Sequence, residues 1–447
     1  MASPQDDDAV AAGPADTSTS RSDPERDRSG LARTFSALRI PNYRTYAAGA
    51  LASNVGTWMH RIAQSWLVLM LTADPRMLGL VVAAQFAPML FLAPWAGVLA
   101  DRYDRRRLLA ITQVGMGLQA LGLGLLVLTG HATGPLVLVA AAILGIFTAV
   151  DGPARQSIVS DLVPADQVVN AVALNSANFN AARLLGPAVA GLMIAAWGPG
   201  WVFMVNAATF AVMFLALSRI RLAPRNTGRR VGGMRDGLRY VRGRPDLWFV
   251  IALAGSVAML LFNFPITIAL MVSDEFAADA RSYGILASLM AVGSLLAALV
   301  QARRARTDLR LVTIAAGLAA LTTILAGLMP SVPTFAAALI ANGAAALTMM
   351  TGANSYLQTR SDDDHRSRVM SLYMAVFFGT TPIGAPVIGL LADEFGPRAA
   401  LVIPGVASLI VTGLLVTAYR AARSAEGLRA APSTNPITAS PAPAITR

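Results

Sequence analysis

Long apolar runs of similar length dominate the chain, and short polar connections separate them. Crossing a bilayer takes a helix of roughly 20 apolar residues, and about twelve runs are of that order. They lie approximately at residues 42–71, 78–100, 108–129, 134–150, 169–197, 201–218, 247–272, 282–302, 311–329, 334–357, 369–392 and 399–419. The pattern predicts an all-α integral membrane protein with twelve transmembrane helices.

The composition agrees with a lipid-facing protein and excludes several kinds of chemistry. Hydrophobic residues make up 55% of the chain and charged residues only 14%, which does not suit a water-soluble globule. There is no cysteine, and the three histidines lie far apart in sequence. We therefore expect no metal site and no cofactor. The absence of a phosphate-binding loop argues against transport driven by ATP within this chain.

The basic residues are all arginine and give a net charge of +11. In a soluble protein this charge would suggest nucleic acid, but here the arginines crowd alternate connections, which indicates the cytoplasmic side of a membrane. The crowded stretches are 102–107, 155, 219–244, 303–310, 360–368 and 420–423, whereas the other connections hold only Arg76, Arg281 and Arg398. We expect a multi-pass protein of the cell membrane with both termini in the cytoplasm and no nucleic-acid partner.

Composition also divides the chain into parts. We expect disordered cytoplasmic tails at 1–35 and 423–447, which are rich in small and polar residues, and two six-helix halves at 36–218 and 247–422. In the linker between them, 219–246, Met234, Leu238 and Val241 share one helical face. A short helix lying in the headgroup region would show this pattern; a basic solvated linker is the alternative.

The two halves carry similar glycines in one register. A shift of 198 residues places Gly186 on Gly384, Gly191 on Gly389, and Gly198-Pro199 on Gly396-Pro397. Duplicated halves that hold a substrate between them near the bilayer midplane are a common transporter architecture. The repeat therefore predicts two pseudo-symmetric halves.

Charged residues cluster in the short connection after the second apolar run. Gly97, Asp101, Arg102, Arg105 and Arg106 lie here, and Asp151 and Arg155 follow the fourth run. The pattern resembles the loop between helices two and three of the major facilitator superfamily. That resemblance implies a cytoplasmic charge latch that holds the halves together when the pore faces outward, with Asp151 as the acid on helix four. The alternative is that these charges only set the topology.

Further strings resemble one branch of that superfamily. Gly186-Pro187 with Gly191 is similar to a Gly-Pro-x-x-x-Gly motif of helix five that is common in its exporters, although a simple packing motif would look the same. Other matching strings are Ser53–Met59, Asp151–Ser157, Asn170–Asn175 and Arg366–Ser371. Together they resemble the branch that contains enterobactin exporters and macrolide-efflux pumps. Ala50 and His60 depart from that pattern, which leaves the substrate open.

Buried charge in a bilayer is costly and usually functional. Well inside the expected spans the ionisable groups are His60, Arg61 and Arg183, with no carboxylate, which favours an anionic or strongly polar ligand. The resemblance implies that helices one, five, seven and eleven line the pore. The expected substrate cavity comprises Asn54, Trp58, His60, Arg61, Gln64, Ser176, Asn180, Arg183, Asn263 and Tyr373. Alternatively, each arginine bonds carbonyl groups at a helix break.

These features predict a secondary active transporter that exports a small polar or anionic organic molecule, such as a siderophore, an antibiotic or another secondary metabolite, by alternating access. Proton antiport is implied by the resemblance, with His60 or Asp151 as candidate carriers. We expect a monomer whose partners are its substrate, the proton and the bilayer. The alternatives are an importer of an organic anion and a membrane sensor without transport. No His/Asp or metal cluster of a membrane enzyme is evident, so we expect no enzymatic activity.

Overall fold

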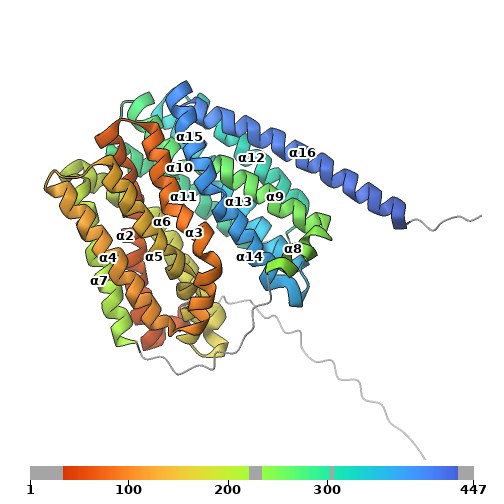
Figure 1. The fold of residues 1–447 in the computed structure, drawn as a ribbon, viewed down its shortest axis with the longest axis horizontal. Helices are drawn as coiled ribbons and strands as arrows, with labels where there is room; N and C mark the ends of the chain where they lie inside the picture. Colours follow the sequence, from red (N-terminus) through yellow and green to blue (C-terminus); the bar gives the residue numbers. More distant parts are fainter. Residues whose placement is uncertain (1–33, 221–233, 303–306, 431–447) are drawn as a thin grey trace, which may run out of the picture.

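The first six long helices form one half of a helical bundle. The structure is a computed structural model that describes residues 34–220, 234–302 and 307–430. The N-terminal half comprises η1 (Ser36–Arg39), α2 (Pro41–Thr72), α3 (Pro75–Arg102), α4 (Arg105–Leu128), α5 (Gly134–Asp161), η2 (Ala165–Gln167), α6 (Val168–Trp197) and α7 (Pro199–Arg219). These helices lie together on one side of the molecule (Figure 1).

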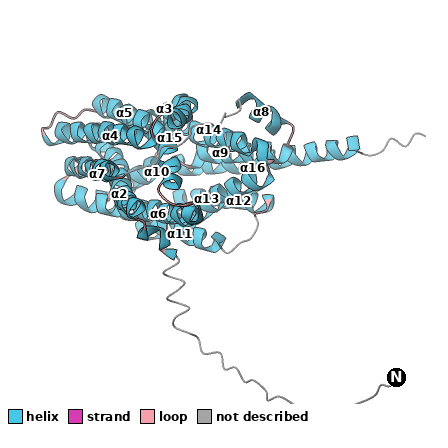
Figure 2. Cartoon of the chain, turned by 90° about the horizontal axis from the view of Figure 1, so that it is seen from below, coloured by secondary structure: helices cyan, strands magenta, loops and turns pink. Residues whose placement is uncertain are grey.

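The C-terminal half repeats this arrangement with more interruptions. It comprises α8 (Met234–Arg242), α9 (Pro245–Leu261), α10 (Phe264–Leu270), η3 (Met271–Glu275), α11 (Ala280–Ala302), α12 (Leu309–Leu328), α13 (Val332–Arg360), α14 (Asp363–Gly379), α15 (Thr381–Phe395) and α16 (Ala399–Ala430). Within the described ranges the chain is helical, with no strand (Figure 2).

Twelve membrane crossings account for these helices. Eleven described helical segments are long and apolar enough to span a bilayer, with α9–η3 and α14–α15 each counting as one. The twelfth is α2, whose 32 residues include several polar positions and which packs against α6 and α7. The predicted all-α membrane fold with two six-helix halves is confirmed.

Several element ends differ from the sequence expectation. Helix α5 continues past residue 150 to Asp161, and α16 continues past residue 422 to Ala430. The seventh crossing is broken between Leu261 and Phe264, because Pro265 cannot donate a hydrogen bond to the preceding turn. Helix α8 occupies part of the expected linker, whereas most of both expected tails lies outside the described residues.

The charges divide the bundle into two ends. The basic end carries Arg105, Arg219, Arg244, Arg310, Arg360 and Arg366 at or beside helix termini. The opposite end, which we call the acidic end, carries Asp74, Asp274, Glu275, Asp279, Asp393 and Glu394 beside Arg76, Arg281 and Arg398. The six acids outnumber the three arginines there, so the bundle has a strong charge asymmetry along its axis.

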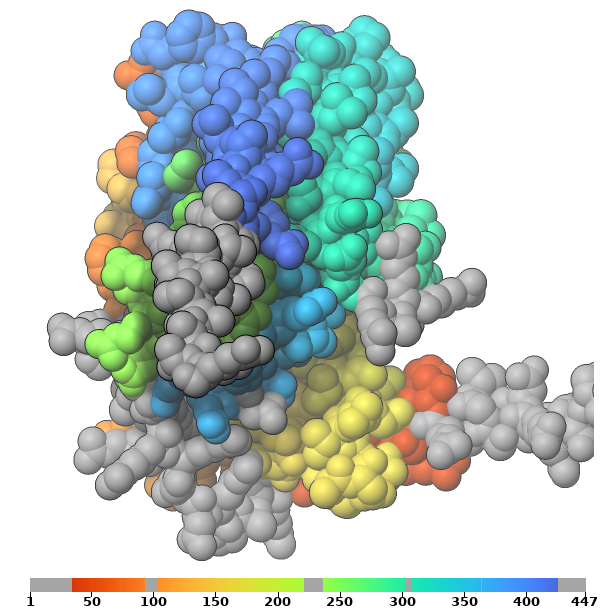
Figure 3. Space-filling view, turned by 90° about the vertical axis from the view of Figure 1, so that its right-hand side faces the viewer, coloured from red at the N-terminus to blue at the C-terminus, as the bar shows by residue number. Residues whose placement is uncertain are grey.

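The segment before α2 is fastened to the start of α6 at the basic end. Ser36 donates to the side chain of Gln167 at 2.6 Å, and the backbone N–H of Ala37 donates to Asn170 at 3.0 Å. The hydroxyl of Tyr43 donates to the carbonyl of Ala171 at 2.7 Å. In Figure 3 the residues at the start of the described chain (red) accordingly lie against those around the start of α6 (yellow).

The internal repeat is visible in backbone geometry. Gly198 and Gly396, which end α6 and α15, have φ of 82° and 83° and ψ of 168° and 167°. Gly186 packs on the backbone and side chain of α2, and Gly384 packs in the same way on Met259 near the end of α9 and on Asn263 just after it. Positive φ at both chain reversals explains why glycine occupies both positions.

The two most extensive contacts between the halves are the crossings of α6 with α11 and of α3 with α15; Figure 1 shows α3 beside α15. A Cβ atom on Gly191 would lie 2.7 Å from the carbonyl oxygen of Ala280 and 3.0 Å from the Cα of Gly284. A Cβ atom on Gly389 would lie 2.6 Å from the carbonyl oxygen of Pro75. Glycine at these positions lets the two backbones touch.

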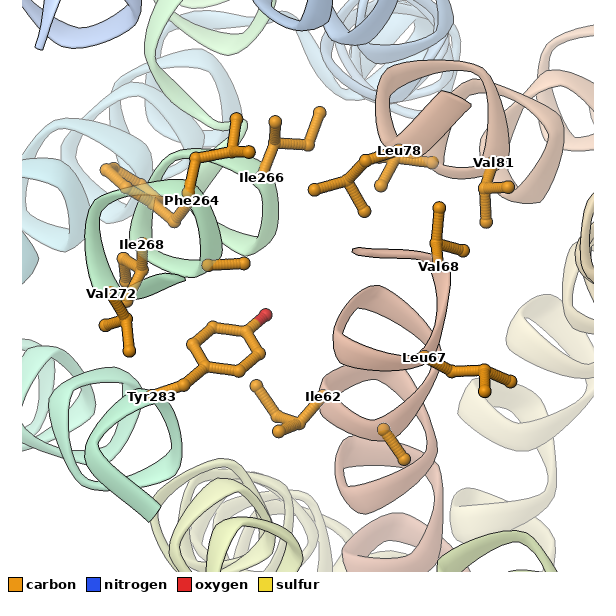
Figure 4. Packing of buried hydrophobic residues seen from close by; sticks show 14 of the residues in the cluster. Ile62, Leu67, Val68, Leu78, Val81, Phe264, Ile266, Ile268, Val272 and Tyr283 are labelled. Carbon is orange, nitrogen blue, oxygen red and sulfur yellow. The ribbon is translucent and has the colours of Figure 1, made fainter. Parts of the chain in front are cut away.

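An apolar cluster fills the space between these crossings. Ile62, Leu67, Val68, Leu78 and Val81 from α2 and α3 pack with Phe264, Ile266, Ile268, Val272 and Tyr283 from α10, η3 and α11 (Figure 4). All of these side chains are buried, and they come from both halves. The acidic end of the molecule is therefore closed by a packed apolar seam.

The seam does not continue along the whole length of α6. One stripe of α6 meets α11 at Leu184, whose carbonyl accepts a 2.8 Å hydrogen bond from Ser288, and at Gly191. The same stripe reaches Ala177 and Ala173 toward the basic end at helical spacing, and both residues are exposed. The two halves thus separate toward the basic end.

Candidate functional site

Two arginines from different helices converge on one indole ring between the halves. The guanidinium carbon of Arg61 on α2 lies 5.0 Å from the ring centroid of Trp58, and that of Arg183 on α6 lies 5.9 Å from it. Phe179 packs edge-on against the same ring at 5.9 Å. Gly186 makes this arrangement possible, because a Cβ atom there would lie 2.5 Å from the Cβ of Trp58.

The charges of these arginines are not neutralised within the described part of the chain. No carboxylate lies within salt-bridge distance of Arg61 or Arg183, and Nε of Arg61 is buried without a hydrogen-bond partner. Cation–π contacts with Trp58 and with Phe86, at 5.6 Å from Arg61, offset part of the cost. The site therefore carries an excess of positive charge inside the bundle.

A small cavity adjoins Arg61. It has a volume of about 30 Å³ and lies between α2, α3 and α10. Its lining comprises Arg61, Gln64, Ser65, Val81, Val82, Gln85, Phe86 and Pro265. Gln64 was expected in the cavity from the sequence, whereas Gln85 and Phe86 were not. The available signal was a polar residue, Gln85, inside the second apolar run.

Three residues expected in the substrate cavity are buried elsewhere. His60 is fully buried and its Nδ1 lies 3.2 Å from the amide of Asn206 on α7. Asn263 is 1% exposed and donates to the carbonyl of Met259 at the break after α9. Tyr373 is 2% exposed and donates to the carbonyl of Met350 within the C-terminal half. Each of these side chains makes its hydrogen bond within its own half of the bundle.

The remaining expected cavity residues lie near the α2–α6 contact. The amide of Asn54 donates to Asn178 at 3.4 Å, and the amide of Asn180 donates to the carbonyl of Ser176 at 2.9 Å. Ser176 itself donates to the carbonyl of Val172. Asn54, Ser176 and Asn180 therefore follow the same two helices as the arginines but already satisfy part of their own hydrogen bonding.

Asp151 belongs to a buried polar cluster inside the N-terminal half. Its carboxylate accepts 2.8 Å hydrogen bonds from Thr112 and Gln113 on α4 and pairs with Nε of Arg155 at 2.8 Å. The same cluster continues to Ser53 on α2, which donates to Gln113 at 3.1 Å. Because α5 continues to Asp161, Asp151 lies within the helix and beyond the expected end of the fourth span at residue 150.

The charged connection between α3 and α4 is anchored by a different acid. Nη1 of Arg105 pairs with Asp161 at 2.6 Å, at the last turn of α5, and Nη2 of Arg106 donates to the carbonyl of Ser218 at 2.8 Å. The side chain of Asp104 accepts from the N–H of Arg107 and caps α4. The backbone places Gly97, Asp101 and Arg102 in the last turns of α3, but their side chains lie outside the described residues.

An ion-pair clamp joins the halves at the acidic end, and the sequence did not reveal it. Nη2 of Arg76 at the start of α3 lies 2.5 Å from both Asp393 and Glu394 at the end of α15. Arg398 pairs with Glu275 at 2.8 Å within the C-terminal half. The sequence offered one signal for these ion pairs, since Arg76 is an isolated arginine in a connection on the arginine-poor side.

The described residues contain no group of three or more His, Asp or Glu side chains placed to hold a metal ion. The polar elements of the centre are instead guanidinium, amide and indole groups, which bind organic ligands by charge, hydrogen bonding and stacking.

Twelve helices in two repeated halves around a polar, positively charged centre define a membrane transporter of the major facilitator type. The comparisons make the class specific. The chain matches the transmembrane secretion effector family over residues 32–441, and it belongs to that family. It is thus a multi-pass membrane transporter and not an enzyme, as the sequence predicted.

Named relatives include siderophore and drug transporters. The staphyloferrin A transporter of Staphylococcus aureus is 25% identical over 373 residues, covering 80% of this chain and 91% of that protein. The multidrug efflux pump Tap of Mycobacterium tuberculosis is 25% identical over 394 residues, covering 83% and 92%. The enterobactin exporter EntS of Shigella flexneri is 24% identical over 386 residues, covering 84% and 91%.

Solved structures agree on the fold. A bacterial homologue of the human lysosomal transporter Spinster superposes with a TM-score of 0.65 at 16% identity, covering 89% of this chain and 97% of that one. A bacterial homologue of the iron transporter ferroportin superposes with a TM-score of 0.67 at 14% identity, covering 86% and 98%.

Proposed function

We propose that this protein exports a small anionic or strongly polar organic molecule across the cell membrane by alternating access. The observation that carries the proposal is the pair of guanidinium groups of Arg61 and Arg183, which converge on Trp58 without a carboxylate partner. Buried charges that lack a partner are costly, so a ligand with complementary charge explains why the two arginines are kept there.

The orientation follows from the charge asymmetry. Positive residues remain on the cytoplasmic side, so the basic end faces the cytoplasm and both termini lie inside. The structure is then closed toward the outside by the apolar cluster and open toward the inside, where Ala173 and Ala177 of α6 are exposed. In this state an exporter would load its substrate from the cytoplasm.

The named relatives support export and suggest the chemical range of the substrate. Their names describe siderophore transport and drug efflux. Siderophores and many antibiotics carry oxygen-rich polar groups, which guanidinium groups bind through charge-assisted hydrogen bonds. We propose a substrate of this kind, bound between α2 and α6.

Transport against a gradient requires coupling, and we propose proton antiport. Asp151 is the stronger candidate carrier, because its buried carboxylate is paired with Arg155 in a chain of polar groups that reaches α2. His60 packs against Phe203 and contacts the amide of Asn206 inside the N-terminal half. When the basic end closes, the cytoplasmic charge latch would hold it shut. We propose that Arg105 and Asp161 belong to this latch.

The proposal is tested by comparing secreted metabolites from a deletion strain, the parent, and strains that express variants. Arg183→Ala is expected to reduce export to the level of the deletion strain while the protein still reaches the membrane. Arg183→Lys keeps the charge but loses the planar fork, so partial export is expected. Arg310→Ala, an exposed arginine at the basic end, serves as the matched control and retains full export.

Unchanged export by Arg183→Ala would refute the role of this site. Net uptake of the labelled compound into energised cells, in place of its loss, would instead favour the importer of an organic anion. No flux in either direction would favour the sensor.

A further inference from the structure

The small cavity beside Arg61 has the dimensions of one functional group. A water molecule needs roughly 10–15 Å³ of cavity measured in this way, so about 30 Å³ accommodates about two water-sized atoms. Two oxygen atoms on one carbon, as in a carboxylate, fill such a space. A larger part of a ligand would have to remain outside, on the side of Trp58.

The cavity is lined by a buried amide side chain. Gln64 is 3% exposed and interacts with the imidazole of His60, but neither its Oε1 nor its Nε2 makes a hydrogen bond of normal geometry. Nε of Arg61 is buried and unpaired in the same way. Leaving buried donors and acceptors without partners is unfavourable. The contact with His60 therefore leaves hydrogen-bonding capacity of this amide unused, which a ligand would satisfy.

The donors around the cavity match an oxyanion. Arg61 supplies a planar guanidinium group that contacts the rings of Trp58 and Phe86, at 5.0 and 5.6 Å from their centroids. The amide groups of Gln64 and Gln85 add further N–H donors. A guanidinium group binds the two oxygens of a carboxylate in parallel, and this geometry is specific for planar anions.

The cavity also lies where the two halves join. Its walls include Val81 and Val82 of α3 and Pro265 of α10, and these elements belong to the apolar cluster that closes the acidic end. A group that enters from the open, basic end stops here. It would touch both halves at the end of its path.

We infer that this cavity is a subsite for a carboxylate group of the transported molecule, bound by Arg61 with Gln64 and Gln85. The inference rests on the proposed export function and deepens it. The substrate is then an organic acid that inserts its carboxylate between α2, α3 and α10. The remainder of the molecule lies along Trp58 toward Arg183.

Binding of a matched acid and amide tests the subsite. Phenylacetate and phenylacetamide have the same shape and differ in charge, and their dissociation constants for the purified full-length protein in detergent can be measured by saturation-transfer NMR. We expect phenylacetate to bind at least about tenfold more tightly than phenylacetamide. We expect Gln64→Leu to weaken phenylacetate binding at least about tenfold.

Protein stability separates a binding role from a structural one. Gln64→Leu removes a buried amide whose only protein contact is a hydrogen bond of poor geometry with His60, so its melting temperature should stay close to that of the parent. Gln358→Leu, at an exposed position where the amide bonds Asn354, is the matched control and should leave binding unchanged. A lower melting temperature of Gln64→Leu together with equal loss of acid and amide binding would overturn the inference.

Equal affinity for phenylacetate and phenylacetamide, or unchanged phenylacetate binding by Gln64→Leu, would also overturn it. This leaves the proposed function intact if the parent strain still secretes a product that the deletion strain lacks. Conversely, selective phenylacetate binding together with identical secretion by the two strains would support the subsite and refute export.

Discussion

The crossing of α6 and α11 allows a sharp prediction about how the protein changes conformation. Gly191→Ala places a Cβ atom 2.7 Å from the carbonyl oxygen of Ala280 and 3.0 Å from the Cα of Gly284. Both neighbours are backbone atoms, which cannot rotate away. Restoring an ordinary contact of about 3.5 Å requires the helices to separate by roughly 0.5–1 Å.

The expected magnitude decides which interaction controls the closed acidic end. Overpacking of this kind costs about 1–3 kcal/mol, and it acts only when the seam is closed. The Arg76 clamp is exposed, and surface ion pairs contribute about 0.2–1 kcal/mol each. Gly191→Ala should therefore shift the equilibrium toward opening at the acidic end by about 5–150-fold. Arg76 makes two such pairs, so Arg76→Gln should cost at most about 2 kcal/mol and shift the equilibrium by no more than about 30-fold.

The natural absence of cysteine makes the assay direct. Val68→Cys places a thiol in the apolar cluster, at a position that is fully buried when the acidic end is closed. Its labelling rate by a membrane-impermeant thiol reagent in intact cells reports opening. Gly317→Ala on α12 is the control, because a Cβ atom there meets nothing within 4 Å, and it should leave the rate unchanged.

A labelling rate that is the same in Gly191→Ala and Gly317→Ala would refute the reasoning. So would a larger effect of Arg76→Gln than of Gly191→Ala, since charge and not backbone contact would then hold the acidic end closed.

Three further predictions concern stability and binding. Asp151→Asn leaves Arg155 without its anionic partner and should destabilise the protein by about 3–5 kcal/mol, measured as a lower midpoint of thermal unfolding; an unchanged midpoint contradicts this. Hydrogen bonds from Ser282 hold the pKa of Asp279 below its usual value. The ionised carboxylate therefore stabilises the folded protein fully above the usual pKa of an aspartate, and this stabilisation is lost as the pH falls through the lowered pKa. Asp279→Ala should accordingly cost about 1 kcal/mol at neutral pH, and its unfolding midpoint should converge with that of the parent in acid. Trp58→Ala removes cation–π contacts of about 0.5–2 kcal/mol and should raise the Michaelis constant for export severalfold in membrane vesicles, whereas Trp58→Phe should retain most of the affinity.

The helical fold could be predicted because each crossing has to satisfy its backbone hydrogen bonds internally, and this leaves a long apolar run in the sequence. Helix ends were less predictable. Helix α5 continues to Asp161 although hydropathy falls near residue 150, and its last turns still bury Ala154, Ile158 and Val159 against neighbouring helices. Pro265 could be read from the sequence. Where it breaks the helix depended on how α10 packs.

The candidate site was predictable where helical spacing decides it. Trp58, Arg61 and Arg183 share helix faces, and the structure brings their side chains together. The positions of Asn263 and Tyr373 depended on how helices rotate within the C-terminal half, which one sequence does not specify. The partnership of Arg76 with residues more than 300 positions away could not be obtained from local pattern.

The glycine crossings join the halves through main-chain atoms, which every sequence possesses. Selection can therefore change the side chains between α2 and α6 without disturbing how the acidic end closes. A family with this arrangement can change its substrate and keep its conformational change. Relatives at 25% identity whose names describe different compounds fit that expectation.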